Sequence, residues 1–566
     1  MNCDIAPDLI IHNARIHTQD PGLPQASALA MGNGRILEVG EDPRILPLAH
    51  TETQIIDAKD RLLLPGLMDS HFHYQDWALG RTGLELAPAS SLQEVLDKVT
   101  QAASQAQPGE WLQGQGWNEG DWPEQRMPTR HDLDRAAPDL PVALARCDLH
   151  LFSVNSKALE LAGITDQTPD PPEGLISRDE HGQPDGILKE QAIGLVKAAI
   201  PDPGEEHLLQ AMQAGIPVLH SLGLTAIHDV RLKGAITDGT MMLRAWQRLD
   251  QETDLKLRCW TSLPGEVVSQ AATLGLRTGF GSQHLRLGHL KYFADGGMGA
   301  RTAWMIEPYE DGGQGLPLIP MHELREMALQ ADAAGLAVMI HAIGDRSSRE
   351  VISILEQVHE HRRKDQGRFS ASPYVNHRIE HLQMVRPEDL DRLARLPVDV
   401  CVQPSNQVID IALLDTCLGQ RGKWAYAFRS MLDAGVRLLF SSDSPVCDPS
   451  PLMGIHALCT RQRPDGTPEY GWHPEQRLSV AEAVHGYTLA PAKAYGADRE
   501  LGSLTPGKRA DCILVDRDIY SIDPREIQHA QVDMTVFDGQ IVYLREECPG
   551  VEVSGCTSVR QSPSKL

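Results

Sequence analysis

The segment RLLLPGLMDSHFH, residues 61–73, joins an apolar run to a carboxylate and a pair of histidines. Its leucines are interrupted by a Pro-Gly step, and the segment ends on Asp69, His71 and His73. In a β-strand, residues i and i+2 point to the same face. We therefore expect His71 and His73 to face one common point from the end of a buried strand.

The composition is that of a large acidic chain. With 566 residues, the chain is too long for one simple core, so several domains or one large barrel with additions are expected. The apolar fraction is 41%, and no run approaches the roughly 18–20 apolar residues of a membrane span. A formal charge of −25 argues against nucleic acid as a partner, because phosphate binding needs a basic face.

The chain has ten cysteines, which are scattered and include no CxxC pair. This usage predicts reduced thiols in a cytoplasmic protein, and it argues against a disulfide framework or a thiolate zinc site. The first twenty residues have no basic start followed by an apolar core, so no secretory signal is predicted.

Short strand-like runs lie at both ends of the chain. Residues 8–18, 28–40 and 53–64 are separated by turn residues, and a similar pattern returns at 509–516 and 532–544. We predict one small β domain built from residues 1–65 and 495–550. Residues 551–566 have no periodicity and are predicted to be a flexible tail.

Between the two ends, β-rich runs alternate with stretches of helical periodicity, such as residues 321–335. Eight such runs lie at 65–73, 224–230, 255–263, 285–295, 336–345, 374–381, 398–405 and 436–445. This alternation predicts an α/β fold, a parallel (β/α)₈ TIM-like barrel over residues 66–494. The interval between the first two runs is too long for one crossover, so an insertion is expected at about 80–205.

Barrel active sites form where the strands end. The residues at or near the predicted strand ends include His71, His73, Lys291, His341, His381 and Asp443. Each alone has an ordinary explanation, such as packing for a histidine, a snorkelling lysine, or a turn-forming aspartate. Together, on five strands of one barrel, they predict a metal site, and imidazole ligands suit zinc.

The sequence resembles the amidohydrolase superfamily of metal-dependent hydrolases, within it the Amidohydro_3 (YtcJ-like) branch. The matching stretches are LLLPGLMDSHFH, KYFADGGMGARTA (291–303), MIHAIGDRS (339–347), HRIEHLQ (377–383), LFSSDSPV (439–446) and YTLAPAKAYGADRELGSLTPGKRADCILVD (487–516). The resemblance covers nearly the whole chain, including WLQGQGWNEGDW and residues 149–164 of the insertion. It implies a barrel that carries a small β-sandwich formed by both termini.

The resemblance also implies roles for the strand-end residues. It implies that His71, His73, His341 and His381 bind metal and that Lys291 is a carbamylated lysine bridging two ions. Asp443 would be both a ligand and the catalytic acid/base. The implied reaction is hydrolysis of a C–N bond, other than a peptide bond, in an amide, formamide or related small molecule. A metal-bound hydroxide would attack the carbonyl or amidine carbon, and the nitrogen would leave with a proton from Asp443. Two zinc ions are expected, although manganese, iron or cobalt fit the same ligands.

Candidate pocket residues are less constrained by the sequence. Trp77, Trp117 and Trp122 are expected to form an apolar pocket wall or plain core. Arg301 is expected either to clamp a carboxylate or an oxyanion, or to pair with Asp295. Family resemblance adds two more candidates, His150 and Gln403.

Two alternatives to the binuclear hydrolase stay open. One is a mononuclear aminohydrolase (deaminase) in which Lys291 is not a ligand. The other is a non-catalytic, oligomerising scaffold, which the complete ligand set disfavours. Substrate identity is not encoded in the barrel and its ligands, since specificity resides in the insertion and loops. The sequence does not determine the oligomeric state, and a homodimer is compatible with the resemblance.

Overall fold

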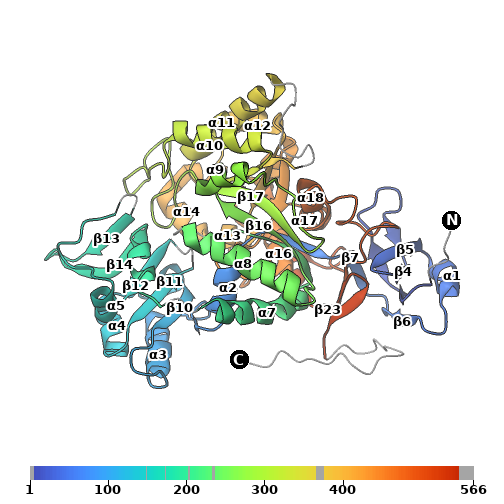
Figure 1. Ribbon diagram of the computed structural model, residues 1–566, viewed down its shortest axis with the longest axis horizontal. Helices are drawn as coiled ribbons and strands as arrows, with labels where there is room; N and C mark the ends of the chain where they lie inside the picture. Colours follow the sequence, from blue (N-terminus) through green and yellow to red (C-terminus); the bar gives the residue numbers. More distant parts are fainter. Residues whose placement is uncertain are drawn as a thin grey trace.

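The computed structural model describes residues 6–147, 150–171, 174–201, 204–231, 236–364 and 375–546, and these residues form four β-sheets. A central barrel lies between two smaller parts, the insertion on the left of Figure 1 and the sheets formed by the termini on the right. The predicted flexible tail, 551–566, lies outside the described residues.

The central sheet has eight strands in the order β21-β20-β19-β18-β17-β16-β15-β8, and all neighbouring strands are parallel. The strands are β8 (Leu67–Phe72), β15 (Leu224–Asp229), β16 (Arg258–Pro264), β17 (Leu285–Phe293), β18 (Val338–Ala342), β19 (His377–His381), β20 (Val398–Val402) and β21 (Arg437–Phe440). Seven of the predicted runs contain one of these strands and the run 255–263 overlaps β16, so the prediction of an eight-stranded barrel is confirmed.

Backbone hydrogen bonds beyond β8 and β21 bring the two ends of this sheet together. The Asp443 N–H donates to the His71 carbonyl at 2.9 Å, and the His73 N–H donates to the Ser444 carbonyl at 2.8 Å. The barrel is thereby nearly closed, and two predicted site segments are joined directly to each other.

Helices lie in every connection between successive barrel strands. The main ones are α7 (Glu205–Ser221), α8 (Ile236–Glu252), α9 (Val268–Thr273), α10 (Met321–Ala334), α11 (Asp345–Lys364), α12 (Pro387–Ala394) and α15 (Phe428–Asp433), with α16 (Pro451–Thr460), α17 (Val480–Gly486) and α18 (Leu489–Ala494) after the last strand. Because the helices cover the outside of the sheet, strands such as β15 and β18 are buried along their whole length. Polar residues inside these strands must therefore be paired.

Both ends of the chain build one six-stranded sheet, in the order β24-β23-β22-β7-β2-β3. Its strands are β2 (Arg15–His17), β3 (Gln25–Ala26), β7 (Leu62–Pro65), β22 (Cys512–Val515), β23 (Val532–Phe537) and β24 (Gln540–Leu544). A four-stranded sheet accompanies it, made of β1 (Leu9–His12), β4 (Ala28–Gly32), β5 (Arg35–Gly40) and β6 (Gln54–Asp57). The two termini thus meet through the antiparallel pair β7 and β22, as predicted.

The insertion after the first barrel strand forms a six-stranded sheet of its own, in the order β13-β14-β12-β11-β10-β9. Its strands are β9 (Leu84–Glu85), β10 (Leu112–Trp117), β11 (Val142–Arg146), β12 (Leu151–Val154), β13 (Gly174–Arg178) and β14 (Pro184–Glu190), and its main helices are α3 (Leu92–Ala103), α4 (Arg130–Ala136) and α5 (Ser156–Leu161). Ser91 begins α3 by accepting a hydrogen bond from the Glu94 N–H. The exact domain boundaries stay predictions.

Among the described residues, no helix is both long and apolar enough to cross a lipid bilayer.

Candidate metal centre and substrate pocket

The six residues predicted as metal ligands converge at the carboxyl ends of the barrel strands. All six are buried: His71, His73, Lys291, His341, His381 and Asp443. His71 lies in β8 and His73 directly after it, and the other four come from β17, β18, β19 and the segment that follows β21. The register of a parallel barrel places these strand ends at one mouth, so residues far apart in sequence become neighbours.

Asp443 lies at the centre of this group. Its Oδ1 is 2.9 Å from His73 Nε2 and 3.4 Å from His71 Nε2, and its Oδ2 is 3.8 Å from His381 Nδ1. Ligand atoms of His71, His73 and Asp443 all lie within 4.8 Å of one another. Lys291 Nζ is 3.5 Å from His71 Nε2, and the ring of His341 lies 4.4 Å from that of His381.

Hydrogen bonds fix which ring nitrogens face this centre. His73 Nδ1 is 2.5 Å from the Val230 carbonyl, and His71 Nδ1 is 2.5 Å from Glu380 Oε2. Both partners only accept, so each Nδ1 carries the proton and each Nε2 presents a lone pair.

Lone pairs of His73 Nε2 and His71 Nε2 therefore face an Asp443 oxygen that is itself an acceptor. Asp443 Oδ1 is buried, and within the described residues it accepts no hydrogen bond of normal geometry. Such electron-pair donors repel each other unless a cation or proton lies between them. Imidazole and carboxylate ligands at this separation fit a divalent cation such as zinc.

The pKa values agree with a ligand role for the imidazoles. Burial lowers the pKa of His71 and His341 well below the usual value, and it lowers the pKa of His381 to about 4. All three are therefore neutral at pH 7 and offer a lone pair. Burial also lowers the pKa of Lys291 to about 8, which increases the fraction of neutral amine that carbamylation requires.

Residues behind the ligands hold them in place. Gln403, a predicted pocket residue, accepts a hydrogen bond from His381 Nδ1 at 2.9 Å and donates to Ser441 Oγ at 3.1 Å. It orients His381 and does not line the pocket. In this orientation His381 presents Nε2 as its free ligand atom.

The sequence analysis missed Glu380 and Arg378. Glu380 accepts the His71 Nδ1–H, and both of its oxygens are 2.9 Å from Arg378 nitrogens. Arg378 also donates to the Ser70 carbonyl at 2.8 Å. The sequence could have identified them, because Arg378 and Glu380 are opposite charges at positions i and i+2 of a buried strand, and buried charges must be paired.

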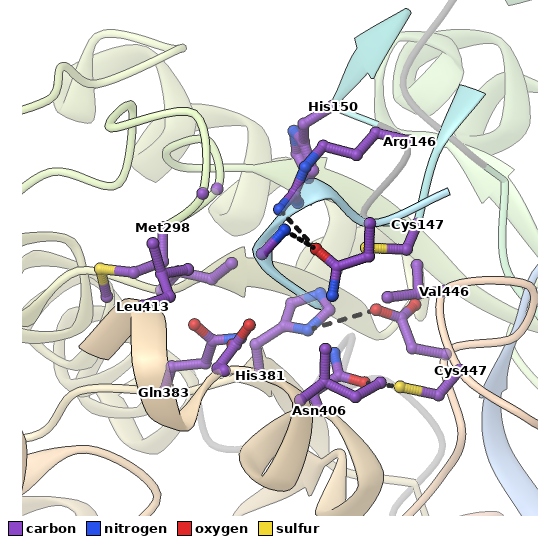
Figure 2. Close-up of a pocket in the computed structure, with 18 of the residues that line it drawn as sticks. Arg146, Cys147, His150, Met298, His381, Gln383, Asn406, Leu413, Val446 and Cys447 are labelled. Carbon is purple, nitrogen blue, oxygen red and sulfur yellow. Dashed lines mark hydrogen bonds and ion pairs between the residues drawn. The ribbon is translucent and has the colours of Figure 1, made fainter. Parts of the chain in front are cut away.

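A cavity of about 420 Å³ opens over the ligand group. Figure 2 shows Arg146 and His150 of the insertion on one side, Asn406 and Gln383 on the other, and His381 between them. Apolar lining comes from side chains that include Met298, Ile343, Ile409, Leu413 and Val446. The cavity lining therefore combines polar and apolar side chains around the predicted ligands, as a small-molecule site does.

The three tryptophans predicted as a pocket wall do not line this cavity. Trp77 packs against Phe72 and Tyr74. Trp117 Nε1 donates to the Leu144 carbonyl and Trp122 Nε1 to the Ala89 carbonyl, so both complete the core of the insertion. The three tryptophans therefore pack in the core, which was the second of the two predictions made for them.

Asp295 and Arg301 do not pair with each other. Asp295 accepts backbone N–H groups of Ile343, Gly344 and Trp304 at 2.8–3.0 Å, and it thereby anchors the loops around the cavity. Burial raises the pKa of Asp295 to about 7. Arg301 lines the cavity and pairs with Asp311 at 2.8 Å, so the predicted salt bridge to Asp295 is wrong.

The sequence profile of the amidohydrolase family matches residues 54–543. The chain belongs to the amidohydrolase family. This confirms the resemblance and makes the chain a metal-dependent hydrolase by class.

Relatives of known sequence match almost end to end. The putative amidohydrolase YtcJ of Bacillus subtilis is 30% identical over 94% of this chain and 99% of its own length. The N-substituted formamide deformylase of Arthrobacter pascens is 28% identical over 95% and 98%, respectively. A solved structure, an uncharacterized metal-dependent hydrolase from Pyrococcus horikoshii, matches with a TM-score of 0.71 at 26% identity, over 91% of this chain and 99% of that one.

Proposed function

We propose that this amidohydrolase cleaves a C–N bond of a small amide or formamide, and that His71, His73, Lys291, His341, His381 and Asp443 hold the divalent metal. The proposal rests on the close approach of two imidazole nitrogens to one carboxylate oxygen: His71 Nε2 and His73 Nε2 lie 3.4 and 2.9 Å from Asp443 Oδ1. The bond type is supported by a relative whose name describes deformylation of N-substituted formamides.

The protein side chains have distinct tasks in this reaction. A divalent metal, when bound, lowers the pKa of water and polarises a carbonyl group. Asp443 accepts a proton from the attacking water and delivers it to the leaving nitrogen, which is general acid–base catalysis. Buried neutral histidines maintain the ligand set, and the insertion supplies part of the cavity lining.

Zinc as the ion, two ions per chain and carbamylation of Lys291 are parts of this proposal. Two observations support the alternative of a mononuclear deaminase. The ligand atoms of His71, His73 and Asp443 suffice for a single ion, and a relative whose name describes a deaminase is 25% identical over 41% of this chain. Metal content per chain separates the two. The cytoplasmic location and a homodimer stay predictions from the sequence.

The test begins with chain purified without chelator and analysed for metal by mass spectrometry. A panel of N-substituted formamides, acetamides and cyclic amides is then assayed for released amine or acid, and aminopurines and aminopyrimidines for released ammonia. About two ions per chain with amide or formamide hydrolysis would support the proposal. One ion with ammonia release would favour the deaminase, and no metal after supplementation would contradict both.

A further inference from the structure

The half-buried His150 and the buried Glu190 form an imidazole–carboxylate pair at the edge of the cavity. His150 precedes β12, and Glu190 ends β14, so both belong to the insertion. His150 Nδ1 is 3.1 Å from each Glu190 oxygen, and the two side chains are only 18% and 3% exposed. The Glu190 N–H also donates to the His150 carbonyl at 3.1 Å.

A barrel loop holds this pair from the other side. Thr302 Oγ1 donates to Glu190 Oε1 at 2.6 Å, and it accepts the Gly297 N–H at 3.0 Å. A Cβ at Gly296 would collide with Thr302 Oγ1 and Glu190 Oε1, and one at Gly297 would lie 3.2 Å from the His150 ring. Gly296 and Gly297 thus permit the insertion to dock closely on the loop after β17.

Glu190 itself adopts a backbone conformation that L residues rarely adopt. Its φ is +53°, in the left-handed region. A non-glycine residue stays in this region only when its surroundings determine it, and such residues cluster at functional sites. The contacts to His150 and Thr302 hold Glu190 in this conformation.

The pair fixes the tautomer of His150. Because the Glu190 carboxylate is an acceptor, the proton of the neutral imidazole resides on Nδ1. Any hydrogen bond from the neutral ring to a substrate therefore uses Nε2, and it uses Nε2 as an acceptor. A substrate must present a donor at that point.

His150 lies within reach of a substrate bound at the predicted metal ligands. It lines the same cavity as Lys291 and His341, and its ring centroid is 5.9 Å from that of His341. An amide whose carbonyl carbon lies over the ligand group has its nitrogen one bond away. Of the two polar positions of an amide, only the N–H is a donor.

We infer that His150 is a neutral imidazole in the enzyme–substrate complex, that it accepts the N–H of the scissile amide, and that it thereby selects amides that carry a hydrogen on nitrogen over N,N-disubstituted amides. This inference rests on the proposed function. Glu190 and Thr302 are positioning residues, which hold the His150 ring in the required tautomer and orientation. The substrate class is accordingly the primary or N-monosubstituted amide.

The experiment compares N-butylformamide with N-butyl-N-methylformamide, or the same matched pair built on the most active amide of the panel. His150→Phe keeps a planar ring over Gly297 and removes the acceptor. We expect kcat/KM for the N–H amide to fall roughly 10- to 100-fold and that for the N-methyl amide to change less than about threefold. His150→Gln, which restores an acceptor, should recover part of the loss.

Positioning variants and a control complete the design. Glu190→Ala and Thr302→Val should reduce the ratio of the two kcat/KM values, whereas Glu190→Gln, which can still accept from Nδ1, should largely retain it. His181→Phe changes a histidine of the insertion that is 78% exposed and should alter nothing. Metal content and melting temperature are measured for every variant, so that a folding defect is recognised.

The outcomes separate this inference from the proposed function. Equal losses on both amides in His150→Phe, or no loss on either, would overturn the role of His150 while hydrolysis by the native chain upholds the function. No hydrolysis of any amide by the metal-loaded native chain would overturn both.

Discussion

The barrel mouth and the insertion supply two walls of one cavity, but different forces fix their side chains. At the mouth, the predicted metal ligands project from strand ends, and ring nitrogens are held by a backbone carbonyl at His73 and by buried side chains at His71 and His381. In the insertion, His150 is oriented by Glu190, which in turn depends on a barrel loop through Thr302. The mouth is positioned by secondary structure and the insertion wall by tertiary docking.

We expect this difference to separate residues that act in the reaction from residues that select the substrate. Ligands on strand ends can move only if the barrel deforms, so substitutions there should affect metal binding and every substrate alike. Residues of the insertion wall line the same cavity but supply none of the predicted metal ligands. Substitutions there should distinguish between substrates and leave the metal content intact. The predictions below test that division.

The largest effect is expected for Asp443→Asn. The amide can neither take the proton of water nor carry the charge that compensates a cation, so kcat should fall roughly 10²- to 10⁴-fold on every substrate. Amine release and metal content are the measurements. Asp448→Asn, an exposed aspartate of the same loop, serves as the control. Retention of more than a tenth of the native rate by Asp443→Asn would assign the acid/base role elsewhere.

Lys291→Ala tests whether the lysine belongs to the metal centre. We expect metal content to fall from about two ions per chain to one or fewer, with activity lost on all substrates. Short carboxylates such as formate or acetate, which can replace a carbamate oxygen ligand, should restore part of both. An unchanged metal content would place Lys291 outside the centre and favour the mononuclear alternative.

Glu380→Gln tests the support behind the ligands. The glutamine can still accept from His71 Nδ1, but the charge is lost, and metal affinity should fall roughly 10- to 100-fold. Arg378 is fully buried and would be left without its carboxylate, so the free energy of unfolding should fall by about 3–5 kcal/mol. Metal titration and urea unfolding measure the two effects.

A double variant tests whether the destabilisation comes from the unpaired charge of Arg378. Arg378→Met combined with Glu380→Gln removes both members of the buried pair, so it should be less destabilised than Glu380→Gln alone. If the double variant is the less stable of the two, the pair does not act as a compensated unit.

Much of the barrel and its ligand group was predictable because both follow from period and register. Apolar runs of strand length alternate with helical periodicity, and parallel strand ends meet at one mouth. His71, His73, His341 and His381 therefore converge as the sequence predicted. Glu380 escaped notice because its significance depends on which side chain faces it across the barrel.

The pocket wall was not predictable in the same way. The sequence suggested Trp77, Trp117 and Trp122 because of their size, but large side chains are equally suited to fill a core, and these three do. Arg301 was expected to clamp a carboxylate or an oxyanion, or to pair with Asp295, because both residues follow the Lys291 strand. It pairs instead with Asp311, while backbone N–H groups occupy Asp295. Docking contacts of this kind leave no periodic signal.

The smallest effect on activity is expected for Met298→Ala, in the apolar lining of the cavity. It is compared with Trp122→Phe, in the core of the insertion. Met298 lines the cavity, so its truncation enlarges the space for a substituent. We expect kcat/KM to shift in favour of bulkier N-substituents by roughly tenfold, with metal content unchanged, because one or two methylenes are worth about 1–3 kcal/mol in a pocket. Trp122 lies in the insertion core, and its loss of volume and of the bond to Ala89 should lower the melting temperature without changing substrate preference. A series of substrates of increasing size is assayed on both variants. A changed substrate preference in Trp122→Phe would mean that the core of the insertion, and not only the residues that line the cavity, determines selectivity.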